Sequence, residues 1–73
     1  MKGDNIMVFK DKLLYVRIKL NISQTELAEK LNVSFSTINR WETGKILPNR
    51  KAELALEIFA KENNINFVEV EDK

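Results

Sequence analysis

The 73-residue sequence predicts a compact all-α domain of four to five helices. Two observations support this fold class. Apolar residues recur at helical spacing in successive segments, and residues that commonly cap or end a helix separate those segments. The length allows one domain, residues 1–73, with a small hydrophobic core. Because a single core of this size contributes only about 3–5 kcal/mol, self-association is expected.

The first helix is expected over about residues 7–20. Its apolar residues repeat at the spacing of one helix face, with neighbours that widen the apolar side. They are Phe9, Leu13, Leu14, Val16, Ile18 and Leu20. Asn21 and Ile22 then interrupt the pattern and end the helix.

Residues 23–43 predict two short helices joined by a tight turn. Ser23 begins a capping-box pattern, in which a serine and a glutamate three residues later satisfy each other's backbone N–H groups. Asn32 stands where a helix commonly ends in a left-handed conformation, and Ser34 can cap the next helix. Such a pair of helices can insert one helix into the major groove of DNA, although the same pattern occurs in small helical bundles.

A fourth helix is expected over about residues 50–62, after Gly44 ends the third helix and Pro48 marks a loop. Its larger apolar residues are predicted to cover most of one side; they are Leu54, Leu56, Ile58 and Phe59. The tail over residues 64–73 is rich in β-forming residues, which predicts a short strand or an extended arm.

The composition excludes several classes of function. The chain has no cysteine and no histidine, so it lacks a thiol nucleophile, the usual general base and the usual zinc ligands. We therefore expect no enzyme activity, no metal and no cofactor. Because no apolar run approaches the roughly 18 residues of a membrane span and no signal peptide is visible, we expect a cytoplasmic, nucleoid-associated protein without a membrane partner. The chain also has no room for a separate ligand domain, so no small-molecule ligand is expected.

Charge is distributed unevenly although the formal net charge is only +1. Residues 1–50 contain nine Lys/Arg and five Asp/Glu, a balance of +4, whereas residues 51–73 contain three Lys/Arg and six Asp/Glu, a balance of −3. A basic front and an acidic tail suit a protein with a DNA-facing end. The alternative is ordinary scatter of surface charge.

The third expected helix carries Phe35, Ser36, Asn39 and Arg40 where a merely solvated face would carry a Glu/Lys mixture. In the major groove, Arg40 can donate two hydrogen bonds to guanine O6 and N7, and the Phe35 ring can pack against a thymine methyl. Ser36 and Asn39 can reach base edges or phosphates. The alternative for Phe35 is a core residue at the start of a helix.

This part of the sequence resembles the Cro/repressor-type (XRE) helix-turn-helix family. The resemblance covers about residues 12–48 without a gap. It implies a lambda-repressor-like domain, usually dimeric on DNA, that reads an operator with its third helix. The matching residues are Leu14, Arg17, Ser23, Gln24, Glu26, Leu27, Ala28, Leu31, Val33, Ser34, Ile38, Trp41, Glu42, Gly44, Lys45 and Pro48.

The resemblance also implies contacts to the DNA backbone. Gln24 is expected to open the second helix against a phosphate and to brace the residue beside it on the recognition helix. Thr37, Asn39 and Lys45 match positions near the backbone, and Arg50 is assigned to the same group. The alternatives are a plain surface residue for Gln24 and solvated loop charges for Lys45 and Arg50.

Arg17 and Glu42 are expected to form a partly buried ion pair, because each is an odd charge on an otherwise apolar stripe. Three features depart from the family pattern. Asn32 replaces the usual glycine of the turn, and Phe35 replaces the commoner polar residue. After Pro48, we expect one longer helix in place of the family's fourth and fifth helices, in the region where its members often dimerise.

The leading hypothesis is a sequence-specific regulator of transcription, most simply a repressor, that binds a double-stranded DNA operator as a homodimer through residues 35–43. A second hypothesis is an antitoxin-like or other protein-interaction module, in which residues 65–70 add a strand to a partner's sheet. The chain is alternatively the DNA-binding part of a larger protein.

Overall fold

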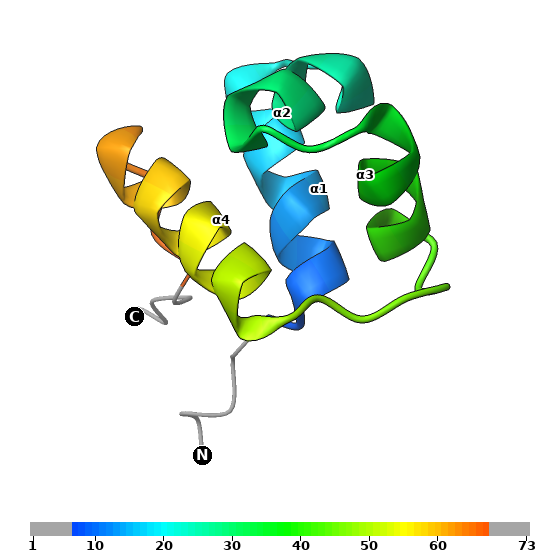
Figure 1. Cartoon of the computed structure of the whole chain (residues 1–73). Helices are drawn as coiled ribbons and strands as arrows, with labels where there is room; N and C mark the ends of the chain where they lie inside the picture. The colour runs from blue at the N-terminus through cyan, green and yellow to red at the C-terminus, as the bar shows by residue number, and fades with distance from the viewer. Residues whose placement is uncertain (1–6, 68–73) are drawn as a thin grey trace.

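Residues 7–67 fold into four α-helices, separated by residues that cap or end a helix. The computed structural model describes residues 7–67, and in this range there is no strand. The all-α prediction is therefore confirmed. The helices are α1 (Phe9–Leu20), α2 (Gln24–Leu31), α3 (Phe35–Glu42) and α4 (Arg50–Glu62) (Figure 1).

The turn between α2 and α3 has the predicted capping geometry. The Ser23 hydroxyl accepts a hydrogen bond from the Glu26 N–H at 3.0 Å, and the Glu26 carboxylate accepts one from the Ser23 N–H at 2.8 Å. Asn32 ends α2 in the left-handed conformation, with φ 61°. Ser34 then caps α3 by accepting from the Thr37 N–H at 3.1 Å. These local bonds fix both helix ends and hence the direction in which α3 leaves the turn.

Three other helix ends are formed in a similar way. Asn21 ends α1 with φ 56°, and its N–H group donates to the carbonyls of Arg17 and Ile18. Gly44, with φ 79°, follows the end of α3 in a conformation that favours glycine. The Asn49 side chain caps α4 by accepting from the Ala52 N–H at 2.8 Å.

The core lies where the helices meet. α1 occupies the centre of the domain, with α3 and α4 on its two sides and α2 across its C-terminal end (Figure 1). Phe9 of α1 meets Trp41 of α3 edge to face, with ring centroids 5.2 Å apart. The fully buried side chains come from all four helices and are Leu13, Val16, Leu27, Ile38 and Leu56.

Only part of the apolar side of the first and fourth helices is buried. Leu14 and Ile18 in α1, and Leu54 and Ile58 in α4, are all exposed. In α4 the chain turns Leu56 inward, and a helix in so small a domain buries only one stripe against its neighbours. These four residues therefore belong to the apolar sides of their helices but not to the core.

The strand predicted in the tail is absent from its described part, which ends at Phe67. Asn64 adopts a left-handed conformation, with φ 60°, and the Ile65 N–H donates to the Ala60 carbonyl at 2.8 Å. Ile65 and Phe67 are buried in the core, where the Phe67 ring lies 6.1 Å from that of Tyr15. Of the two predicted forms, the described part of the tail therefore has that of an arm, which packs on the domain through Ile65 and Phe67. The rest of the tail, residues 68–73, lies outside the described residues.

None of the helices within residues 7–67 is long and apolar enough to cross a membrane.

Phe67→Ala is expected to lower the free energy of unfolding by about 3–5 kcal/mol, because it removes a buried aromatic ring. Leu47→Ala is the control, since Leu47 is 87% exposed and its loss is expected to cost no more than about 0.5 kcal/mol. Urea denaturation followed by circular dichroism measures both. Equal stability of the two variants would show that the arm is not part of the core.

Candidate nucleic-acid interface

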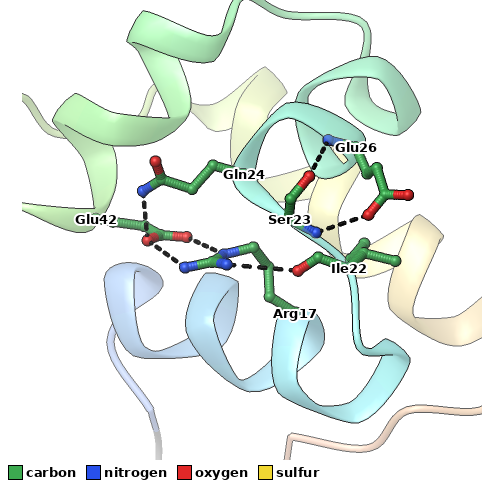
Figure 2. Close-up of polar contacts among 6 residues, drawn as sticks. All are labelled: Arg17, Ile22, Ser23, Gln24, Glu26 and Glu42. Carbon is green, nitrogen blue, oxygen red and sulfur yellow. Dashed lines mark hydrogen bonds and ion pairs between the residues drawn. The ribbon is translucent and has the colours of Figure 1, made fainter.

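The C-terminal end of α3 is held by a hydrogen-bond network around Glu42. Arg17 of α1 donates from Nε to one carboxylate oxygen at 2.8 Å and from Nη2 to the other at 3.1 Å. Gln24 of α2 donates from Nε2 to the same carboxylate at 2.8 Å (Figure 2). Arg17 also donates to the Ile22 carbonyl at 3.4 Å. Glu42 therefore ties α3 to both α1 and α2.

Two physical reasons make Arg17 the right partner for Glu42. A carboxylate at the C-terminal end of a helix opposes the helix dipole, so Glu42 needs a compensating cation. The guanidinium group also matches a carboxylate with two parallel hydrogen bonds. Only 22% of the Arg17 side chain and 12% of the Glu42 side chain are exposed, so water screens this ion pair less than it screens a surface pair.

Gln24 has a role that sequence reasoning missed. Glu42 can only accept hydrogen bonds, so the amide nitrogen of Gln24 faces the carboxylate and its carbonyl oxygen points away (Figure 2). In the structure, Gln24 thus braces Glu42 at the end of α3. The second amide hydrogen of Gln24 is still available for a phosphate, and this contact stays a prediction. No local sequence pattern indicates the link, because the two residues are 18 positions apart.

The residues expected to read bases lie on the outer side of α3. Phe35 is 50% exposed, so the alternative of a core residue is wrong. Ser36 and Arg40 are also exposed, and Asn39 is half-buried. These positions share one helix face, while Ile38 and its neighbour Trp41 turn into the core. The structure therefore brings the four side chains together on one outward surface.

The residues expected at the DNA backbone are spread over three elements. Thr37 is half-buried in the N-terminal cap of α3, where its hydroxyl lies 2.9 Å from that of Ser34. Lys45 is exposed in the loop that follows α3. Arg50 is exposed at the start of α4 and borders a hollow together with Phe9.

Glu42→Gln is expected to lower the free energy of unfolding by about 1–3 kcal/mol, because an amide nitrogen would replace an oxygen that accepts from Arg17 or Gln24. Glu57→Gln is the matched control. The Lys12–Glu57 ion pair is 2.7 Å long, close to the 2.8 Å of the Arg17–Glu42 pair, but half of the Glu57 side chain is exposed. Its loss is expected to cost at most about 1 kcal/mol. If urea denaturation shows equal losses, Glu42 does not fix α3 in the way its geometry indicates.

Comparisons with known proteins identify the family of the domain. Residues 13–58 match the sequence model of a helix-turn-helix family. The HTH-type transcriptional activator BcrR of Enterococcus faecalis is 44% identical over 46 residues, which cover 63% of this chain and 22% of that relative. No solved structure gives a significant match. The matched region begins in α1 and ends in α4. It therefore contains the clamp on α3, which is the hydrogen-bond network of Arg17, Gln24 and Glu42. It also contains the outward face of α3, which carries Phe35, Ser36, Asn39 and Arg40. The chain therefore belongs to the helix-turn-helix family of the Cro/repressor (XRE) type.

Proposed function

We propose that this domain binds double-stranded DNA in a sequence-specific manner and regulates transcription, with α3 in the major groove. The observation that carries the proposal is the contrast between the two sides of α3. Its inner side is clamped through Glu42, whereas its outer side presents Phe35 and Arg40 to solvent. A rigid helix with an exposed, chemically mixed face is what base reading requires.

Each side chain on that face has a specific partner in the groove. Arg40 binds guanine through O6 and N7, and Phe35 packs against a thymine methyl group. Ser36 and Asn39 contact base edges nearby. These contacts select the sequence, because they depend on groups that differ between base pairs.

The flanking polar and basic residues bind the phosphates. We assign this role to Gln24, Thr37, Lys45 and Arg50. The assignment of Gln24 is supported by the position of its amide, which is fixed at the start of α2. The assignments of Lys45 and Arg50 are supported by their exposure, in the α3–α4 loop and at the start of α4. Such contacts position the protein on the duplex and make its affinity depend strongly on salt.

We also propose that two copies of the chain bind together as a homodimer. One short recognition helix reads only a few base pairs, so two helices about 34–36 Å apart would read a two-fold operator. Binding that overlaps a promoter would repress transcription by steric exclusion. The relative in Enterococcus faecalis bears the name of an activator and is much longer than the match. The same domain could thus serve as the DNA-reading part of a longer protein, with the position of the operator setting the sign of regulation.

The protein-interaction hypothesis receives less support. It requires the segment from residue 65 to residue 70 to be free to join a partner's sheet. Ile65 and Phe67 are instead buried against the domain. A chain ending at Phe67 tests the remaining six residues without removing core side chains, and unchanged oligomeric state and partner binding would dispose of a role for them.

Arg40→Ala is expected to relax selectivity at a single base position, at a cost of about 1–3 kcal/mol on the preferred base. The measurement is selection of random duplex DNA followed by sequencing, for the native chain and the variant. The native chain is expected to yield a palindromic motif. Weakening that is equal on all sequences would contradict the assignment of Arg40 to a base.

Lys45→Ala is expected to weaken binding on every sequence and to reduce the slope of log K against log salt by about 0.9, the value for one phosphate contact. Lys61→Ala is the charge-matched control, because Lys61 is exposed near the C-terminal end of α4, and α4 lies across α1 from α3 (Figure 1). Fluorescence anisotropy at several salt concentrations measures both slopes. Equal slope changes for the two variants would mean that Lys45 makes no specific phosphate contact.

A further inference from the structure

The loop between α3 and α4 presents an apolar side chain that the fold does not use. Leu47 is 87% exposed, more than any other large apolar side chain in residues 7–67, and its neighbour Ile46 is 42% exposed. Leaving such groups in water is unfavourable, and apolar side chains exposed next to a binding surface commonly belong to it.

Positive charge predominates around this loop. Residues 43–52 contain Lys45, Arg50 and Lys51 and no Asp or Glu, a balance of +3. The acidic residue just before this stretch is Glu42, which Arg17 neutralises. An apolar group set among cations fits a polyanion that also has apolar surface. The DNA backbone is such a surface, because deoxyribose C–H groups lie between its phosphates.

The loop is attached directly to the residue assigned to base reading. The Arg40 carbonyl accepts hydrogen bonds from the Lys45 N–H at 2.9 Å and the Ile46 N–H at 3.5 Å. Pro48 restricts the backbone of the residue before it, which is Leu47. The loop leaves the end of α3, projects beyond it and returns to α4 (Figure 1). When α3 enters the groove, these hydrogen bonds keep the loop close to Arg40 and therefore close to the DNA.

We propose that Leu47, supported by Ile46, packs against the deoxyribose groups of the DNA strand that borders the groove occupied by α3. This inference rests on the proposed DNA binding and adds an apolar contact to it. The cations of residues 43–52 bring the backbone to the loop, and Leu47 then buries its side chain between two phosphates. Because sugars are the same at every base, the contact adds affinity without selecting a sequence. An apolar contact also releases no counterions, which separates its effect from that of Lys45.

The test uses three variants of Leu47 in the full chain, titrated by fluorescence anisotropy against the duplex selected by the native protein, at several salt concentrations. Leu47→Ala is expected to weaken binding roughly tenfold, with an unchanged salt slope and with the same loss on single-base variants of the site. Leu47→Met keeps the apolar contact and is expected to bind like the native chain. Leu47→Lys is expected to steepen the slope by about 0.9, because a cation there would meet a phosphate.

Ile18→Ala is the control, because Ile18 is an apolar residue of α1 that is 68% exposed and has no assigned role. Leu47→Ala binding as well as Ile18→Ala would overturn the proposal. So would a change in the sedimentation of the DNA-free chain on Leu47→Ala, which would assign this loop to contacts between copies. If the native chain enriches no duplex at all, the proposed function fails first, and the contact at Leu47 fails with it.

Discussion

The position of α3 depends on one carboxylate. Glu42 ends α3 with a charge that the helix dipole disfavours, and it accepts hydrogen bonds from Arg17 of α1 and Gln24 of α2. These bonds connect three helices at one point. Without them, the turn from α2 and apolar contacts such as that between Phe9 and Trp41 would orient α3, and apolar contacts are less directional. A helix that reads base edges must hold its side chains within a fraction of an ångström, and the hydrogen bonds to Glu42 hold the end of α3 against two other helices.

A small core explains why so much apolar surface remains outside. The inward stripes of the four helices and the two tail residues Ile65 and Phe67 fill the interior. Other apolar side chains are therefore exposed, and they form two groups that differ in their position. Phe35 and Leu47 lie on α3 and its following loop, where a DNA partner would cover them. Leu54 and Ile58 lie on the outer face of α4, and nothing in residues 7–67 covers them.

Local signals in the sequence predicted much of this structure. Ser23, Asn32 and Ser34 placed the ends of α2 and α3 correctly, because capping acts over three or four residues and is readable from neighbours. Helical spacing also predicted which side chains of α3 face outward, namely Phe35, Ser36, Asn39 and Arg40. The link from Gln24 to Glu42 and the burial of Phe67 were not, because both depend on residues far apart in the chain. In the tail, composition alone left a strand and an arm as alternatives, and the described part up to Phe67 is an arm packed on the core.

The most direct test of the central claim, a clamped α3 with a DNA-reading outer face, is an NMR titration of the isotopically labelled chain with its selected duplex. The backbone amides of Ser36, Arg40 and Leu47 are expected to shift most. The amides of Ala60 and Lys61, in the last turns of α4, are expected to move little. Shifts concentrated on α4, with α3 unchanged, would contradict the claim and would identify a different binding surface.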